Sequence, residues 1–313
     1  MQLVSTTSLS STPDDDGALI RTVRSLPGNR SGTPLRLHPA TPILLAMSIP
    51  YRAETVLIEG PDAIAFANAQ FSSKVTSLAA GQWQFSAWLD PQGRVRALFH
   101  LARIAEDRLL LLLRGGSAAP MAAALQRFVF RSKLAITAAA PRALSTGQAL
   151  PMHAVLDEAD VLSLGCGGHS LQITGAPGGD DRWRLPQLHE GWPWLPAPAL
   201  NDLLPPALSL QRLQAVVIDK GCYPGQEIVA RLHYRGGHRQ HLYSVELSQA
   251  ATSGESLRMR QTDAGRLLDV VVTDTRIEAL AVLRDDVVAQ AIDGRLDVFD
   301  NHLAIHVDTA WPA

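Results

Sequence analysis

KGCYPGQEIVAR, which occupies Lys220–Arg231, is the stretch of this sequence that composition and core packing alone would not produce. It places the thiol of Cys222 in a turn flanked by glycines, two residues after the amine of Lys220. Glycine allows backbone angles and close approaches that a side chain blocks. Such an arrangement is typical of a loop that positions one reactive side chain.

The residues around Cys222 favour a thiolate. A thiol reacts as its thiolate, and a neighbouring lysine or a helix N-terminus stabilises that charge. The segment Gln226–His233 predicts a short helix, because Glu227 and Arg231 stand four residues apart and apolar side chains share another side. Cys222 would then lie at the positive end of this helix beside Lys220, which makes these two the candidate catalytic residues. The alternative is a buried thiol without chemistry, because free cysteine is among the most buried residue types.

The whole stretch resembles the signature of the YgfZ family, K-G-C-[YF]-x-G-Q-E-x-x-x-R, with Pro224 in a variable position. Members of this family are folate-binding relatives of the glycine-cleavage T-protein, an aminomethyltransferase. A match over this many fixed positions is far more specific than a lone glycine pattern. Further segments that resemble family motifs are Gly60–Ala63 with Gln70–Val75, Leu89–Val95 and Phe130–Leu134. The resemblance extends from about residue 40 to the C-terminus.

The resemblance implies an α+β protein with a three-lobed, ring-like aminomethyltransferase (GcvT-like) fold, a small C-terminal β-barrel and a ligand hole between the lobes. It implies tetrahydrofolate or a one-carbon derivative as the cofactor. It also implies a role in iron–sulfur cluster assembly or maintenance, which supports cluster-containing tRNA-modifying enzymes. The residues expected at the folate are Arg231, Glu227, Gln226 and Tyr223. The first three of these would mainly shape the loop, and Arg231 would also meet an anion.

Two positions depart from the family pattern. Lys74 stands where relatives usually carry an aspartate, so the role of that acid is in question here. Leu188–Gly191 is Leu-His-Glu-Gly, whereas aminomethyltransferases carry an acid in a Leu-Glu-Ala-Gly setting that is thought to meet the pterin. This difference counts against an aminomethyltransferase more than against a YgfZ-like protein.

Composition predicts an ordinary soluble globular protein. At 313 residues, 46% hydrophobic and 19% charged, the chain is long enough for two or three packed units. Its formal net charge of −2 argues against a surface that binds nucleic acid as a whole, and we expect no direct nucleic-acid binding. Cys166 and Cys222 are its two cysteines, a count that predicts no disulfide framework and a reducing, cytoplasmic compartment. No apolar run approaches the roughly 20 residues that span a bilayer.

The pattern along the chain predicts a flexible leader over 1–34, followed by three lobes over 35–140, 141–240 and 241–313. The leader lacks apolar periodicity. Its run Asp14–Asp16 argues against a transit peptide, because that class is poor in acids. The second lobe would carry the motif, and the third alternates short strands with Gly and Asp turns, as small β-barrels do.

Periodicity also predicts individual elements in the first two lobes. A hairpin is predicted over 83–104, with its turn at Asp90–Gly93, where proline and glycine suit a tight turn. A helix is predicted over 117–131, with Phe128 on its apolar side. We expect an irregular connector over 139–151.

The segment after the motif is basic. Arg231, Arg235 and Arg239 lie in a stretch without any acid between Glu227 and Glu246. One interpretation is a solvated loop, because charge runs usually face water. The other is an anion-binding rim that suits the glutamyl tail of folate, because guanidinium groups pair with carboxylates.

Two groups of aromatic side chains have more than one interpretation. The three histidines within 233–241 lack the spacing of a standard zinc or iron site, so we predict no dedicated metal site. Trp183, Trp192 and Trp194 would either stack on a pterin ring or fill the core.

Three hypotheses for function follow. In the first, which we favour, the chain is a folate-dependent YgfZ-like factor for iron–sulfur cluster assembly or repair. Cys222 would then act as a thiolate in redox exchange, one-carbon handling or contact with a client cluster, and the partners would be folate and iron–sulfur client or assembly proteins. In the second it is an aminomethyltransferase that transfers a one-carbon unit to tetrahydrofolate. In the third it is a non-catalytic adaptor that bound folate stabilises.

Overall fold

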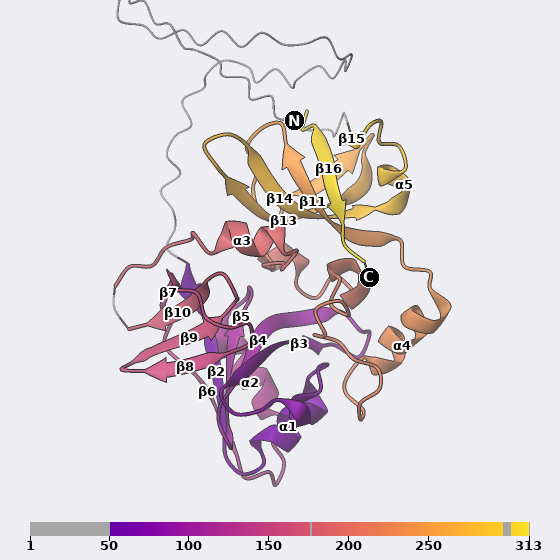
Figure 1. Ribbon diagram of the computed structural model, residues 1–313. Coiled ribbons are helices and arrows are strands. Elements are labelled where there is room, and N and C mark those ends of the chain that lie inside the picture. Colours follow the sequence, from indigo (N-terminus) through magenta and orange to yellow (C-terminus); the bar gives the residue numbers. More distant parts are fainter. Residues whose placement is uncertain (1–50, 176, 297–301, 313) are drawn as a thin grey trace, which may run out of the picture. The chain divides into compact units, whose positions relative to one another are not determined.

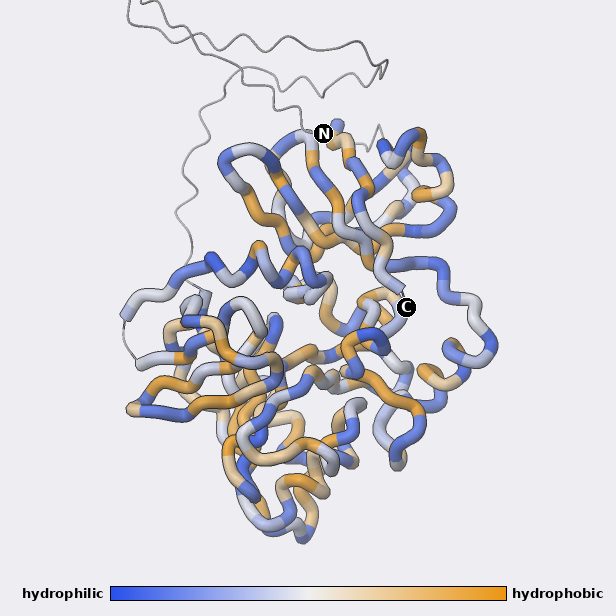
Figure 2. The backbone as a smooth tube through the Cα atoms, viewed as in Figure 1, coloured by the Kyte–Doolittle hydropathy of each residue, from blue (hydrophilic) through white to orange (hydrophobic). Residues whose placement is uncertain are grey.

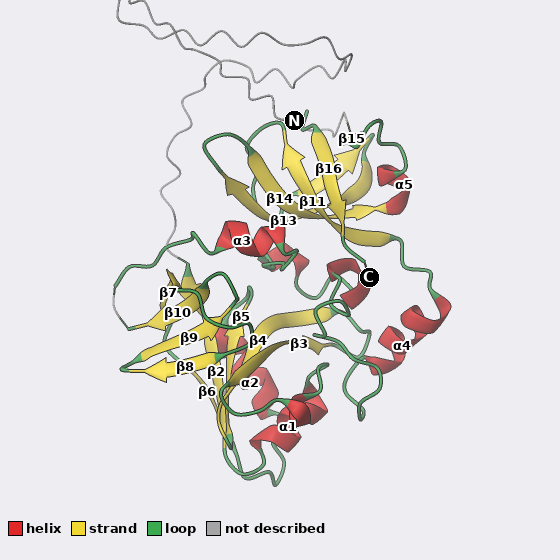
Figure 3. Ribbon diagram, viewed as in Figure 1, coloured by secondary structure: helices red, strands yellow, loops and turns green. Residues whose placement is uncertain are grey.

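The computed structural model describes residues 51–175, 177–296 and 302–312, and the predicted leader over 1–34 lies outside them. The described chain forms three antiparallel β-sheets joined by short helices (Figures 1 and 3). This mixture confirms the predicted α+β class. No helix within the described ranges is both long and apolar enough to cross a membrane.

The N-terminal sheet has the strand order β3-β4-β5-β2-β6. Its strands are β2 (Thr55–Glu59), β3 (Gln82–Leu89), β4 (Val95–Ala105), β5 (Arg108–Leu113) and β6 (Ala135–Ala138). The predicted hairpin is confirmed, since β3 pairs with β4. β5 is a run of leucines because both faces of the sheet are covered. Leu109 and Leu111 belong to the cluster formed with helices α1 (Ala63–Gln70) and α2 (Ala118–Gln126), whereas Leu112 belongs to the central core.

The predicted helix over 117–131 is too long. Phe128, which follows the end of α2, is 49% exposed, and Arg131 has a left-handed φ of 61°. The chain turns here because β6 returns to pair with β2. The N–H of Lys133 donates to Oδ2 of Asp62 at 2.6 Å, so a side chain distant in sequence holds this turn. Strand pairing therefore overrides the helical periodicity.

The middle sheet has the strand order β1-β7-β10-β9-β8. Its strands are β1 (Arg52–Ala53), β7 (Arg142–Gly147), β8 (Val155–Glu158), β9 (Val161–Gly165) and β10 (Ser170–Thr174). The predicted connector over 139–151 is wrong, because β7 lies within it and pairs with β1 and β10. β7 has no strong alternation, since Leu144 is its one buried residue. We keep the lobe limits 35–140, 141–240 and 241–313 as a proposal.

The C-terminal sheet has the strand order β12-β13-β14-β11-β16-β15. Its strands are β11 (Gln240–Leu247), β12 (Ser256–Met259), β13 (Thr262–Val272), β14 (Ile277–Arg284), β15 (Arg295–Leu296) and β16 (Ile305–Ala310), and helix α5 is Asp285–Val288. Register shifts occur beside Ser244, Leu257 and Leu267. Such bulges bend strands and increase their twist. This sheet is the barrel-like unit that was expected at the C-terminus.

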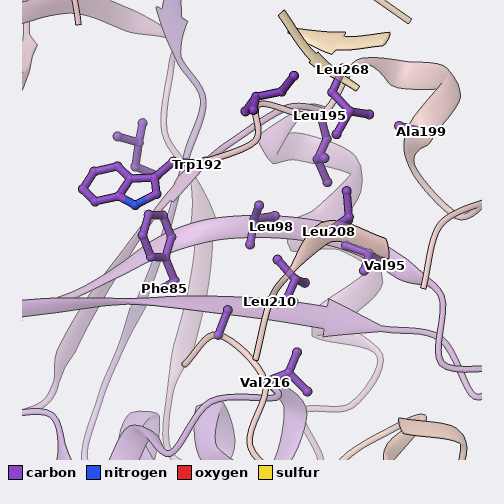
Figure 4. Packing of buried hydrophobic residues seen from close by; sticks show 14 of the residues in the cluster. Phe85, Val95, Leu98, Trp192, Leu195, Ala199, Leu208, Leu210, Val216 and Leu268 are labelled. Carbon is purple, nitrogen blue, oxygen red and sulfur yellow. The ribbon is translucent and has the colours of Figure 1, made fainter. Parts of the chain in front are cut away.

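A central core joins the three sheets. It contains Leu98 of the N-terminal sheet, Leu171 of the middle sheet and Leu268 of the C-terminal sheet. Figure 4 shows part of this core, where the rings of Phe85 and Trp192 lie 5.1 Å apart, and in Figure 2 the strands around it are mostly hydrophobic. The remaining helical elements are η1 (Val75–Ser77), α3 (Arg184–His189), η2 (Ala197–Ala199), η3 (Pro205–Leu208) and α4 (Gln226–Arg235).

Among the described residues, Arg114 and His100 are the most deeply buried basic side chains. Arg114 is 1% exposed and donates to the carbonyl oxygens of Pro193 and Trp192 at 2.9 and 2.8 Å, and to Oε1 of Gln187 at 2.7 Å. His100 is fully buried, and within the described structure neither of its ring nitrogens has a hydrogen-bond partner. Burial, and then the charge of Arg114, lowers the pKa of His100 well below its ordinary value.

We expect His100 to make the fold sensitive to acid. The unfolded chain binds a proton on His100 near the ordinary pKa of about 6.5, whereas the folded state does not. The free energy of unfolding should therefore fall as pH falls below about 6.5, by about 1.4 kcal/mol per pH unit for this proton. In His100→Phe that slope should decrease by about one proton, measured by urea unfolding at several pH values.

The control for this prediction is His233→Phe. His233 is exposed, so this substitution removes an imidazole of the same kind but not a buried one, and the slope should match that of wild type. Equal slopes for wild type and His100→Phe would contradict the prediction.

Candidate functional site

The helix of the motif starts directly on the β3–β4 turn. Gly225 precedes α4 with a left-handed φ of 78°, and a Cβ there would lie 2.5 Å from the carbonyl oxygen of Asp90. Gly93 in the turn has a φ of 79°, and its Cβ would lie 3.0 Å from the Cβ of Ile228. Glycine is required at both positions because a side chain meets strain and close neighbours there. Two segments that the family resemblance identified separately therefore meet in space.

Lys220 attaches the start of the motif to the end of α1. Its Nζ donates to the carbonyl oxygens of Asn68, Phe71 and Ser73 at 2.7, 2.6 and 2.7 Å. An ammonium group has three N–H donors, so these three bonds use all of them. Burial lowers the pKa of Lys220 to about 8, while the three carbonyl oxygens favour its charged form. The side chain thus has a structural role in the loop.

Tyr223 and Gln226 are also bonded within the loop. Tyr223 is 6% exposed, its hydroxyl donates to the carbonyl oxygen of Val217 at 3.0 Å, and burial raises its pKa to about 12. Nε2 of Gln226 donates to the carbonyl oxygens of Ile218 and Lys220 at 3.1 and 3.2 Å. These contacts fix the path of the chain before α4. Contact of either residue with folate stays a prediction.

Cys222, Glu227 and Arg231 are exposed to solvent. Cys222 is therefore an accessible free thiol, in contrast to Cys166, which is buried and whose pKa burial raises to about 12. All three N–H donors of the Lys220 ammonium bond to carbonyl oxygens, so none remains for a hydrogen bond to a thiolate. Stabilisation of a Cys222 thiolate by Lys220 stays a prediction, and it would act through space rather than through a hydrogen bond.

A cavity of about 280 Å³ lies where the three sheets meet. Residues in its wall include Tyr51 and Glu54 beside β1, Trp194 before η2 and Asp269 in β13. None of residues 220–231 is in this wall. The motif and the cavity are therefore separate features of the described structure.

Aromatic rings form one side of the cavity. Tyr51 packs edge-on against Trp183 and Trp194, with ring centroids 5.3 and 5.8 Å apart. Trp194 lines the cavity, whereas Trp183 is fully buried and Trp192 is 6% exposed. Of the three tryptophans, Trp194 is thus placed to stack on a ligand, and the other two fill the core.

A buried ion pair lies beside this aromatic wall. Arg184 donates to the carboxylate of Asp269 and, at 2.7 Å, to the carbonyl oxygen of Val270. Burial, and then the charge of Asp269, raises the pKa of Tyr51 to about 12, so its hydroxyl stays protonated at neutral pH. The cavity therefore offers a carboxylate, a neutral hydroxyl and an aromatic face.

Sequence reasoning missed Tyr51 and Asp269. Asp269 carries a usable signal, because it is the single acid in the apolar run LLDVVV, and a charge in a buried strand needs a partner. Tyr51 carries no such signal, since only the arrangement of three sheets brings it to the cavity.

Within the described ranges, no group of three or more His, Cys, Asp or Glu residues could hold a metal ion. The rings of His238 and His241 lie 5.5 Å apart, and Nδ1 of His241 contacts Oδ1 of Asp285 at 2.6 Å. His241 is thus paired with Asp285 near the start of β11, and these two histidines form no such group.

Comparison with known proteins gives relatives and a fold neighbour. No family model matches the chain. Over 279 residues it is 26% identical to the tRNA-modifying protein YgfZ of Edwardsiella ictaluri, which covers 75% of this chain and 83% of that protein. The tRNA-modifying protein YgfZ of Sodalis glossinidius is 24% identical over 280 residues, which covers 76% of this chain and 84% of that protein.

One fold neighbour is the glycine cleavage system aminomethyltransferase T from Bartonella henselae. Its crystal structure superposes with a TM-score of 0.55 and 14% sequence identity, and the match covers 82% of each chain. This likeness confirms the predicted aminomethyltransferase-like fold.

We expect Lys220→Met to destabilise the protein by about 2 kcal/mol or more, because it leaves three carbonyl oxygens without their charged donor. Urea unfolding measures this change. The matched control is Lys133→Met, which removes an exposed lysine and should change the free energy of unfolding by no more than about 0.5 kcal/mol. Equal effects of the two substitutions would show that the three bonds do not hold the loop.

Proposed function

We propose that the chain is a member of the YgfZ family and a folate-dependent factor that supports iron–sulfur cluster assembly or repair and thereby tRNA-modifying enzymes. The relatives named above are tRNA-modifying proteins. The observation that carries the proposal is an accessible cysteine in the matching motif, on the same chain as a cavity lined by residues from all three sheets. Its partners would be folate and iron–sulfur client or assembly proteins.

The cavity is the folate site in this proposal. Ligand pockets usually measure about 300 to 1,000 Å³, so about 280 Å³ suits the pterin ring system, with the rest of the ligand extending outward. A pterin presents adjacent N–H donors and a flat ring. Asp269 and Glu54 supply carboxylate oxygens in the wall, and Trp194 supplies a ring for stacking. The residues present therefore fit a reduced folate.

Glu54 is held in place for this role. Its Oε2 accepts a hydrogen bond at 2.8 Å from the N–H of Ala118 at the start of α2. Asp269 is held in the same way by Arg184. Side chains fixed by the protein lose little entropy when a ligand binds.

Cys222 is the reactive group in this proposal. It lies three residues before Gly225, on the N-terminal side of α4, where a helix favours negative charge. A surface thiolate there is accessible to a client protein, whereas the buried Cys166 is not. Aminomethyl transfer, the activity named for the fold neighbour, needs no cysteine, so the requirement for Cys222 separates the two functions.

We expect tetrahydrofolate to bind the purified protein, and Trp194→Ala to weaken that binding about 5-fold or more, because stacking on an aromatic ring contributes about 1 to 3 kcal/mol per base. Calorimetric titration measures both affinities. Phe130→Ala is the control, because Phe130 is 77% exposed and does not line the cavity. Unchanged affinity in Trp194→Ala would exclude the cavity as the pterin site.

We expect Cys222→Ser to abolish rescue of iron–sulfur enzyme activity in a strain that lacks the native gene, because serine supplies no thiolate at neutral pH. Cys166→Ala is the matched control and should rescue. Full rescue by Cys222→Ser would eliminate the thiolate role and favour an adaptor that folate merely stabilises.

A further inference from the structure

The solvent-facing side of α4 is basic and aromatic. Arg231, Tyr234 and Arg235 stand three and four residues apart and so share one side of the helix, and Arg239 follows in the loop to β11. All four are exposed, Tyr234 to 76%. We call these four residues the α4 face. The one acid of α4, Glu227, lies in its first turn.

The positive charges of the α4 face are not neutralised within the described structure. None of the ion pairs found there includes Arg231, Arg235 or Arg239. Asp285, whose N–H donates to the carbonyl oxygen of Arg239, has its carboxylate on His241 instead. In Figure 2 the chain from the end of α4 to β11 is largely hydrophilic. These guanidinium groups are therefore free to bind an anion.

The combination of side chains matches unpaired RNA better than other anions. Guanidinium groups bind phosphate oxygens bidentately, and bases of single-stranded loops stack on exposed aromatic rings. Tyr234 stands between the two helix arginines in sequence and supplies such a ring, which packs edge-on against the ring of His233 with centroids 5.0 Å apart. Acidic side chains of a peptide would pair with the arginines but carry no ring to stack on Tyr234, and the cavity that suits a pterin is elsewhere.

We infer that the α4 face binds unpaired loops of tRNA directly, and the choice of tRNA among RNAs rests on the proposed function. The expectation of no nucleic-acid binding came from the net charge of −2 over the whole chain. Affinity for a phosphate backbone depends on the cations that contact it, and a local group supplies them. Because α4 starts four residues after the exposed Cys222, bound RNA lies beside the motif.

The test is titration of labelled, unmodified tRNA with the purified full-length protein, followed by fluorescence anisotropy between about 50 and 200 mM salt. Wild type should bind with a Kd of about 10⁻⁴ to 10⁻⁶ M. The double variant Arg231→Glu/Arg235→Glu should bind at least about 10-fold more weakly than wild type. The slope of its log affinity against log salt concentration should decrease in magnitude by about 1 to 2. Tyr234→Ala should lower the affinity for tRNA by about 5-fold or more, whereas Tyr234→Phe should keep it because the ring remains.

The matched control is Arg127→Glu/Arg258→Glu, which changes the net charge equally at two exposed arginines outside the α4 face. It should bind within about twofold of wild type. Equal loss in this control would mean that overall charge, not the α4 face, binds the RNA. No binding by wild type tighter than about 1 mM at low salt, or binding of polyglutamate in place of tRNA, would overturn the inference.

The folate titration of the wild type separates this inference from the proposed function. Folate binding without tRNA binding removes the RNA inference alone. tRNA binding without folate binding removes the proposed cofactor and leaves the α4 face as an RNA site. Thermal unfolding of each variant shows that it is folded before its affinity is compared.

Discussion

The three hydrogen bonds from Lys220 to the carbonyl oxygens of residues 68–73 are the constraint on which the arrangement of the motif depends. The chain between η3 and α4 has no long helix or strand, so its backbone groups must find partners elsewhere. The same segment also supplies Ser72, whose Oγ donates to the carbonyl oxygen of Ala215 at 2.7 Å. Hydrogen bonds from a charged donor are roughly twice as strong as neutral ones. Together these contacts bring Gly225 onto the β3–β4 turn, and α4 starts from there.

The motif and the cavity use different kinds of residue. The motif is consecutive in sequence, and its inward side chains, Tyr223 and Gln226, bond to the carbonyl oxygens of their own loop. The cavity instead gathers single residues from three sheets. A ligand that fills it touches all three, so its binding free energy adds to the stability of their junction. In the proposed function, this coupling would let bound folate stabilise the protein even where it undergoes no reaction.

Sequence reasoning reached elements and motifs but not the partners of their side chains. The hairpin and α4 follow from local periodicity, whereas the end of α2 and the presence of β7 depend on pairing with strands far along the chain. The partner of Lys220 at Asn68 lies 152 positions away, so no local pattern predicts its structural role. The family resemblance identified the motif and the fold, because it carries information about distant contacts that one sequence does not display.

The net charge of the whole chain is a poor guide to anion binding, for a physical reason. Arg114 counts in the net charge, yet it is 1% exposed and cannot reach a ligand in solvent. The charge of Arg184 is offset by that of Asp269. What remains for binding is the set of exposed, unpaired cations. Arg231 and Arg235 stand four residues apart, a like-charge spacing that costs a helix about 0.2 to 0.5 kcal/mol, and only Arg235 gains from the negative helix end. A helix that keeps this repulsion at its surface, with an exposed tyrosine on the same side, is suited to an anion with rings.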